Sequence, residues 1–270
     1  MRDDRSQDFD LLRKAAQDAG KLALSYFGRS VKKQQKPDGS TVTEADHAVD
    51  ELLDSRLRRA RPEYGWLSEE SAEHEGRRAA RRVWVVDPID GTRAFVQGLD
   101  DWTIAAALVE DGGPILAAVV NPVRGETFEA CAGEGAFLNG RPIHVSEASA
   151  LEGARFTVPE PVLRNSRWRT PWPPLKPVLA NSILYRLALV ACGRADASFA
   201  LKPKWEWDIA AGALLVSEAG GIITDPSGSP LTFNSAEAKV PGYLAAAPKL
   251  HKTLRERMHG ALEGAPAARG

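Results

Sequence analysis

The chain has 270 residues, of which 43% are hydrophobic, and a formal net charge of −1. This length suits one large domain or two closely associated ones, and the apolar content can fill a core without disulfides or structural metal. A charge near zero gives no general attraction to nucleic acid or anionic membranes, so we expect neither as a partner.

The cysteines and the first residues of the chain indicate the cellular compartment of the protein. Cys131 and Cys192 are the only cysteines and form no CxxC pair, which argues against a disulfide framework or a zinc cluster. The first ten residues, MRDDRSQDFD, lack the apolar segment of a secretory signal, and no apolar run approaches membrane-spanning length. These features predict a cytoplasmic protein.

Apolar residues recur at three- and four-residue spacing in two early segments, which predicts two amphipathic helices. The first spans residues 9–26 and ends at Gly28, and the second spans residues 45–60 and ends at Arg61-Pro62. The polar segment between them, residues 32–43, is expected to be a loop.

The pattern changes to short apolar stretches after residue 100. They are separated by turn residues such as Asp111-Gly112-Gly113 and Asn139-Gly140, which predicts a largely antiparallel sheet. The expected strands are residues 103–109, 115–120 and 127–132.

Residues 159–177 are rich in Pro, Arg and Trp and are expected to form an irregular segment between two halves of the chain. We therefore predict an N-terminal α+β half, residues 1–158, and a C-terminal α/β half, residues 159–270, that closes the active site in one compact unit. Helices over 184–192 and 209–219 and a strand over 222–224 complete a layered architecture.

The most informative stretch is WVVDPIDGTRAF, residues 84–95. An apolar run ends at Asp87, and Asp90 follows three residues later, before Gly91. Two carboxylates on a tight turn repel each other, and their burial is costly unless a cation lies between them. Hard divalent cations such as Mg²⁺ prefer oxygen ligands, so the stretch predicts a metal site at a strand end. Ordinary turn aspartates are the alternative.

Two further acidic sites strengthen this prediction. Glu69 and Glu70 follow an apolar pair, so one of them can point inward while its neighbour points outward; a solvated acidic loop is the alternative. Asp208 opens a helix, where a helix N-cap is the alternative role. Together the three sites could supply the oxygens that two or three Mg²⁺ ions need.

Three motifs resemble, in order and spacing, the signature motifs of the inositol monophosphatase superfamily: the acidic pair Glu69-Glu70, DPIDGT at 87–92, and WDIAAGALLVSEAGG at 207–221. The resemblance reaches from the first helix to about Ile223. It implies an α+β fold built as an α-β-α-β-α layered sandwich, Mg²⁺-dependent hydrolysis of a small phosphorylated metabolite, and inhibition by lithium. Members are commonly homodimers, so a homodimer is expected from the resemblance alone.

The resemblance also implies a set of metal ligands. Glu69, Asp87, the backbone carbonyl of Ile89, Asp90 and Asp208 would hold the Mg²⁺ ions, with Asp208 also facing the substrate.

Other residues would act on water and phosphate. Thr92 would join Glu69 in orienting the attacking water, and the N–H groups of Gly91 and Thr92 would hold the phosphate. Arg93 could assist at the start of a helix, with a surface ion pair as its alternative role.

Thr43 and Asp46 have two compatible interpretations. Their spacing is that of a capping box that opens the second helix. The resemblance places Asp46 near a third, weaker metal and Thr43 in a water-orienting network. Lys33 or Lys36, in the preceding loop, could contact the phosphate.

The sequence indicates the substrate less clearly than it indicates the metal site. Inositol-selective members carry a glutamate about seven residues before the WD aspartate, where this chain has Leu201. Glu206-Trp207-Asp208 resembles the bisphosphate-nucleotidase branch, which acts on 3′-phosphoadenosine 5′-phosphate. The segments 38–46 and 90–95 resemble both that branch and the histidinol-phosphatase branch. We expect an inositol-1-phosphate-type phosphatase, with these two activities, or a regulatory binding protein on the same fold, as alternatives.

The remaining aromatic and imidazole side chains are weaker candidates. The middle loop could stack on a base or contact a second phosphate, or it could be plain surface; its residues are Arg164, Arg167, Trp168, Arg169 and Trp172. The histidines show no metal-ligand spacing and are expected to be at the surface or to have no part in the site; they are His47, His74, His144, His251 and His259.

Overall fold

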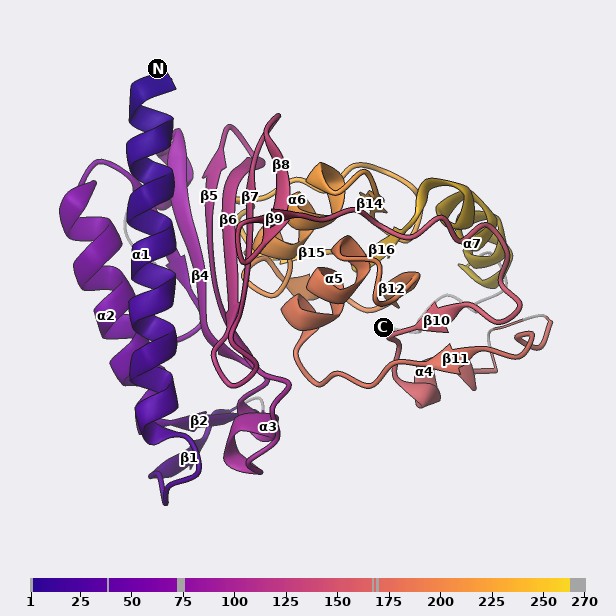
Figure 1. Cartoon of the computed structure of the whole chain (residues 1–270), viewed down its shortest axis with the longest axis horizontal. Coiled ribbons are helices and arrows are strands. Elements are labelled where there is room, and N and C mark those ends of the chain that lie inside the picture. Colours follow the sequence, from indigo (N-terminus) through magenta and orange to yellow (C-terminus); the bar gives the residue numbers. More distant parts are fainter. Residues whose placement is uncertain (1, 38, 72–75, 167, 169, 263–270) are drawn as a thin grey trace.

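The computed structural model describes residues 2–262 except positions 38, 72–75, 167 and 169. Its helices and sheets stack in five layers, which confirms the predicted α-β-α-β-α sandwich (Figure 1). None of the helices in these residues is long and apolar enough to cross a membrane. The helices are α1 (Arg2–Tyr26), α2 (Glu44–Ala60), α3 (Thr92–Val96), α4 (Glu160–Leu163), α5 (Ile183–Ala191), α6 (Ala210–Glu218) and α7 (Pro248–Leu262), with a 3₁₀ turn at Arg77–Ala79.

Two large sheets and two small ones account for the strands. The seven-stranded sheet has sequential order: β3 (Gly65–Ser68), β4 (Arg82–Asp90), β5 (Thr103–Glu110), β6 (Gly113–Asn121), β7 (Glu126–Cys131), β8 (Gly135–Leu138) and β9 (Arg141–Pro142). The five-stranded sheet has the order β11 (Lys176–Pro177), β10 (Arg155–Phe156), β12 (Ala197–Ala200), β16 (Tyr243–Ala246) and β14 (Ile222–Thr224). The small sheets pair β1 (Lys33–Gln35) with β2 (Thr41–Thr43), and β13 (Lys204–Trp205) with β15 (Lys239–Val240).

The seven-stranded sheet is buried on both faces, which explains the continuous apolar run of β4. Successive side chains of a strand point to opposite faces. Val83 and Val85 pack with α5 and α6, whereas Trp84 and Val86 pack with α1 and α2. Pairing is antiparallel from β4 to β9, as predicted, and parallel between β3 and β4.

The two DPID carboxylates lie inside β4 rather than on a turn after it, which corrects the sequence prediction. Asp87 pairs with Ala105 and Asp90 with Thr103, so three steps along β4 oppose two along β5. One extra residue in one strand is a β-bulge, and it reverses the alternation of side chains beyond it. The bulge therefore allows two residues three positions apart to face the same side of the sheet.

The loop predicted between the two early helices contains a short hairpin. Residues of β1 and β2 pair in antiparallel register, with Lys33 opposite Thr43. The predicted second helix agrees closely with α2, and the first ends as predicted at Tyr26 but begins at Arg2 rather than at residue 9. The boundary between the two predicted halves at residue 158 stays a prediction, although β10 already belongs to the second sheet.

The aromatic middle segment packs against the protein itself. Trp168 and Trp172 lie against Phe199 and Phe156 on the outer face of the second sheet, and Trp168 donates a hydrogen bond to the Val162 carbonyl. These two rings are therefore not an open stacking platform, and the segment contains α4 and β11. Arg167 and Arg169 lie outside the described residues.

One histidine is buried rather than at the surface. His251 is buried in α7, where its Nε2 lies 3.0 Å from the hydroxyl of Thr224 on β14. His47 and His144 are exposed, as expected. His74 and the side chain of His259 lie outside the described residues.

Replacement of Gly212 by Ala is expected to destabilise the layer between the two sheets. A Cβ at Gly212 would lie 2.4 Å from Cδ1 of Leu187, because α5 and α6 approach each other closely there. We expect the free energy of unfolding to fall by about 1–3 kcal/mol, as for other overpacked cores. Urea denaturation measures the change. Leu187→Ala should cost less in the Gly212→Ala background than alone, and strictly additive losses would contradict the packing argument.

Candidate metal and phosphate site

The site begins with Asp87, whose carboxylate is buried and has no partner. The side chain is 1% exposed, and neither oxygen accepts a hydrogen bond from the described residues. Burial raises the pKa of Asp87 well above its ordinary value, and the charges of Glu69, Asp90 and Asp208 raise it further. An anion in these surroundings is stabilised only when positive charge joins it.

Asp90 is positioned by the start of α5. Its Oδ2 accepts hydrogen bonds from the Ser182 hydroxyl and from the Leu184 N–H, both at 2.6 Å. Burial raises the pKa of Asp90 to about 6, although these two hydrogen bonds and the charge of Arg186 oppose the shift. The sequence analysis missed this role of α5; Ser182 as an N-cap residue was the available signal.

Asp208 lies between β13 and α6 and does not cap the helix. The N-cap position is Ile209, and α6 begins at Ala210. Burial, followed by the charges of Asp90 and Glu69, raises the pKa of Asp208 well above its ordinary value. The N-cap interpretation of Asp208 is therefore wrong, and the carboxylate belongs to the acidic group.

The buried Glu206, whose structural role was not predicted from the sequence, holds the segment before Asp208. Glu206 is fully buried and accepts hydrogen bonds from the N–H groups of Asn234 and Ser235, at 2.6 and 2.8 Å. Arg77, itself 1% exposed, binds the same two residues through the Asn234 side chain and the Ser235 carbonyl. This network fixes the backbone from which Asp208 extends.

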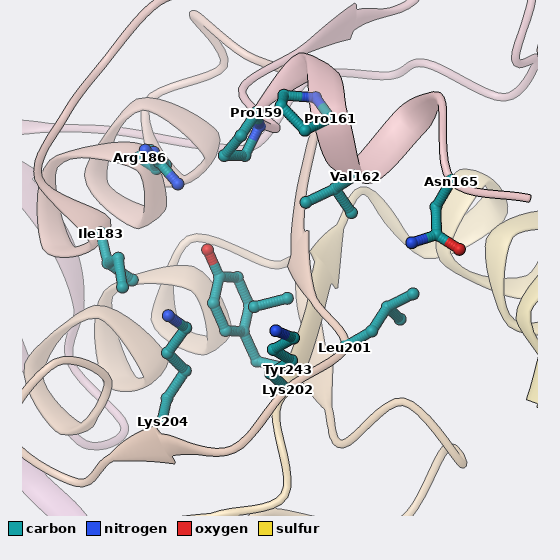
Figure 2. Close-up of a pocket in the computed structure, with 11 residues that line it drawn as sticks. Pro159, Pro161, Val162, Asn165, Ile183, Arg186, Leu201, Lys202, Lys204 and Tyr243 are labelled. Atoms are coloured by element: carbon teal, nitrogen blue, oxygen red, sulfur yellow. The ribbon is translucent and has the colours of Figure 1, made fainter.

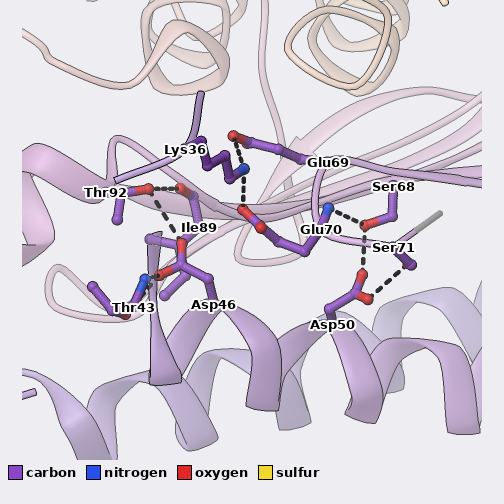
Figure 3. Close-up of polar contacts among 10 residues, drawn as sticks. All are labelled: Lys36, Thr43, Asp46, Asp50, Ser68, Glu69, Glu70, Ser71, Ile89 and Thr92. Carbon is purple, nitrogen blue, oxygen red and sulfur yellow. Dashed lines mark hydrogen bonds and ion pairs between the residues drawn. The ribbon is translucent and has the colours of Figure 1, made fainter. Parts of the chain in front are cut away.

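Glu69 and Glu70 share one cation (Figure 3). The ammonium group of Lys36 lies 2.9 Å from Glu69 and 2.7 Å from Glu70, so neither carboxylate points away from the other. Burial raises the pKa of Glu70 to about 7, because the opposing contact with Lys36 only partly offsets it. The expectation that one glutamate turns outward is therefore wrong, and Lys36 contacts carboxylates in this structure.

A second network joins the start of α2 to the end of β4 (Figure 3). Asp46 Oδ2 accepts hydrogen bonds from the backbone N–H and the hydroxyl of Thr43, at 2.8 and 2.6 Å, which confirms the capping box. The Thr92 hydroxyl lies 3.2 Å from the other oxygen of Asp46 and 3.0 Å from the carbonyl of Ile89. Burial raises the pKa of Asp46 against these hydrogen bonds.

The turn after β4 requires glycine. Gly91 has a φ of 92° and precedes α3, and a Cβ there would lie 3.4 Å from Ser182 and from Trp102. Arg93 is exposed, and no carboxylate of the described residues forms an ion pair with it. The surface ion pair considered for Arg93 is thus not formed with this part of the chain.

The donor set fits hard divalent cations. The buried, partnerless oxygens of Asp87 lie among other carboxylates, and the nearby carbonyl of Ile89 adds a neutral oxygen ligand. Within the described residues no three acidic, imidazole or thiolate side chains already form a closed coordination set. Two of the nearby carboxylates, those of Glu69 and Glu70, contact Lys36 instead.

Layers of helices around two sheets, with buried carboxylates at the end of a bulged strand, define a metal-dependent phosphatase architecture. The comparisons agree. Residues 4–262 match the model of the inositol monophosphatase family. The chain belongs to this family, and it is a metal-dependent phosphomonoesterase.

Relatives carry several names at similar identity. The chain is 34% identical over 230 residues to "Nus factor SuhB" of Xylella fastidiosa, covering 82% of each chain. It is 33% identical to "Inositol monophosphatase 2" of Solanum lycopersicum, covering 82% of this chain and 88% of the relative. It is 36% identical to "Histidinol-phosphatase" of Chlorobaculum parvum, covering 82% and 86%. A solved IMPase structure from Thermotoga maritima superposes with a TM-score of 0.79 at 30% identity, covering 97% of this chain and 98% of that one.

Asp87→Asn is expected to stabilise the metal-free protein and to remove its response to Mg²⁺. The amide keeps the shape of the side chain but removes a buried charge surrounded by like charges. Thermal unfolding with and without Mg²⁺ measures both effects. A rise in melting temperature with Mg²⁺ that is equal in the two proteins would contradict the assignment of Asp87.

The metal-free protein is expected to lose stability as pH rises from about 4 to about 7. The pKa values of Asp90 and Glu70 are raised to about 6 and about 7, so in this window the folded state binds more protons than the unfolded state. The free energy of unfolding then falls with rising pH. Urea denaturation at several pH values in a chelator tests the sign. A stability that rises over the whole window would contradict it.

Proposed function

We propose that this protein hydrolyses a small phosphate monoester by direct attack of water, with two or three Mg²⁺ ions held by Glu69, Asp87, Ile89, Asp90 and Asp208. The reaction converts a monoester and water into an alcohol and inorganic phosphate. The observation that supports the proposal most directly is the pair of buried Asp87 oxygens without partners. When bound, Mg²⁺ supplies positive charge for the phosphate oxygens and increases the acidity of a coordinated water.

The residues of this chain would orient the attacking water. The Thr92 hydroxyl has one proton, which it can donate to Asp46 or to the Ile89 carbonyl. Its oxygen lone pairs then remain available to accept a hydrogen bond from the water. Asp46 is fixed by Thr43, so the direction of the Thr92 hydroxyl is fixed in turn.

Glu69 would accept the second hydrogen bond of the water. Lys36 contacts only Oε1 of this carboxylate within the described residues, so Oε2 can face the water. Two acceptors, Glu69 and Thr92, define the position of a water better than one, and correct placement is a large part of phosphoryl-transfer catalysis.

The phosphate would be held at the turn after β4. The backbone N–H groups of Gly91 and Thr92 begin α3 and have no intrahelical acceptor, which makes them available to phosphate oxygens. Arg93 follows in the same turn and can approach the phosphate from solvent. In-line attack then requires the water and the leaving oxygen to lie on opposite sides of the phosphorus.

Candidate substrates come from the motifs and from the relatives. The chemistry is of the inositol-1-phosphate type, and relatives named inositol monophosphatase and histidinol-phosphatase are similarly distant. The 3′(2′),5′-bisphosphate nucleotidase activity is the third candidate. A kcat/KM comparison of inositol 1-phosphate, histidinol phosphate and 3′-phosphoadenosine 5′-phosphate separates them.

A regulatory binding role on the same fold is a second candidate, favoured by the relative named Nus factor. It is compatible with catalysis, because a fold can carry more than one function. Homodimer formation, lithium inhibition, a cytoplasmic location and the absence of nucleic-acid and membrane partners stay predictions. Size-exclusion chromatography with light scattering tests the first of them.

Asp90→Asn is expected to lower Mg²⁺-dependent phosphate release at least a hundredfold, a scale typical of loss of one key charge-stabilising group. The asparagine retains the shape of the side chain and an oxygen for Ser182 and Leu184, so the fold should persist. Phosphate release is measured with Mg²⁺, and circular dichroism confirms folding.

Asp111→Asn serves as the matched control, because Asp111 lies on a surface turn with a φ of 50°, which asparagine tolerates. This variant should keep wild-type turnover. Near-normal turnover by a folded Asp90→Asn protein would remove Asp90 from the site.

A further inference from the structure

A cavity of ≈ 300 Å³ opens beside the acidic site, between the start of α5 and the connection from β12 to β13 (Figure 2). This volume is at the lower end of the range for small-molecule sites. Three of its lining side chains carry positive charge, and Lys204 extends from β13 toward the centre of the cavity. The positively charged residues are Arg186, Lys202 and Lys204, and the apolar ones include Pro159, Ile183 and Leu201.

The cavity adjoins the carboxylates that would hold the metal. Arg186 acts electrostatically on Asp90, and Lys204 acts on Asp208. Tyr243, whose hydroxyl points into the cavity toward Arg186, is affected by the charges of both aspartates. A ligand whose phosphate lies at the acidic site can therefore extend its other end into this space.

Among the described residues, the lining of the cavity carries positive charge without a carboxylate of its own, and the opposite charges that act on it are Asp90 and Asp208 of the acidic site. None of the described residues that line it is acidic. Neither Lys202 nor Lys204 forms an ion pair with a carboxylate of the described chain, and Arg186 donates only to the carbonyls of Ala180 and Asn181. Three like charges around one small space repel each other, and a ligand of opposite charge relieves the repulsion.

The rest of the lining argues against a polyol or a cation in this space. Leu201 gives an apolar wall where a hydroxyl-rich group would need acceptors, so burying sugar hydroxyls there leaves them without partners. An ammonium group would meet Arg186 and Lys204 at close range and would be repelled.

We propose that the substrate carries a second anionic group, a phosphate or a carboxylate, on the alcohol that leaves, and that Arg186, Lys202 and Lys204 bind this group. The inference rests on the proposed phosphatase function and names its substrate class. The scissile phosphate lies over the acidic site, and the second anion lies in the cavity.

Two matched pairs of monoesters test the proposal by kcat/KM with Mg²⁺. Glycerol 1-phosphate and 3-phosphoglycerate differ by a carboxylate in place of a neutral terminal group. Adenosine 3′-phosphate and adenosine 3′,5′-bisphosphate differ by a second phosphate. In at least one pair the anionic member should be preferred about tenfold or more, mainly through KM, because each charge-assisted contact contributes on this scale. The pair that shows the preference identifies the anion, and histidinol phosphate should be the poorest substrate.

Lys202→Gln and Lys204→Gln are expected to lower that preference about tenfold, because each raises the KM of the anionic member more than that of the neutral member. Lys249→Gln, at an exposed position of α7, is the control and should behave as wild type. Equal rates within both pairs, or variants that slow both members alike, would overturn the proposal and leave the phosphatase function intact.

A binding measurement tests the anion site even if none of these monoesters is hydrolysed and the proposed phosphatase function is wrong. Calorimetry with the Asp90→Asn protein compares adenosine 3′,5′-bisphosphate with adenosine 3′-phosphate. At least tenfold tighter binding of the bisphosphate, lost in the Asp90→Asn, Lys202→Gln double variant, supports the anion site independently of turnover. Equal affinities in this measurement would overturn it.

Discussion

The structure of the site depends mainly on one constraint: several carboxylates are buried close together without a positively charged partner among the described residues. Asp87 is buried with both oxygens free of hydrogen bonds, and at least three other carboxylates act on it. In water these groups would separate, and in a core they would protonate. The protein holds them on rigid elements, where the pKa values of Asp87, Asp90 and Asp208 are raised, so that protons relieve part of the repulsion when no cation is bound. The hydrophobic core on both faces of β4, where Val83 to Val86 are buried, offsets the unfavourable free energy of burying these carboxylates.

Three local features of the fold hold these carboxylates in position. A single bulge in β4 turns Asp87 and Asp90 to the same side of the sheet. The start of α5 saturates one oxygen of Asp90, and the Glu206 network secures the segment that carries Asp208. These contacts come from the sheet, from the start of α5 and from the loop that contains Asn234 and Ser235. The α5 helix that positions Asp90 also packs closely against α6 at Gly212.

Most of the helices and strands, and the residues of the acidic site, could be predicted from the sequence. Periodicity located α1, α2, α6 and the antiparallel strands, since those patterns are local. Asp-Pro and Asp-Gly suggested a turn at DPIDGT, but pairing with β5 keeps Asp90 in the strand, and no local pattern records that pairing. Lys36 contacts glutamates 33 and 34 positions away, so its partners depend on tertiary structure. Composition likewise could not tell that Trp168 and Trp172 face a core, because aromatic residues suit a core and a ligand surface equally.

The acidic site and the basic cavity have opposite charge, and α5 connects them. Ser182 and Leu184 at its start hold Asp90, and Arg186 lines the cavity, so four residues separate the first contact from the last. Four residues of an α-helix span about 6 Å along its axis. The spacing between Asp90 and Arg186 is therefore set by a rigid helix, whereas Lys202 lines the cavity from the segment that connects β12 to β13 and Lys204 from the start of β13. The two anionic substrates differ in reach, because two carbons separate the leaving oxygen from the carboxylate in 3-phosphoglycerate, whereas a ribose separates the two phosphates in adenosine 3′,5′-bisphosphate. Because the helix does not adjust, the reach of the substrate, as well as its charge, should decide which monoester is hydrolysed.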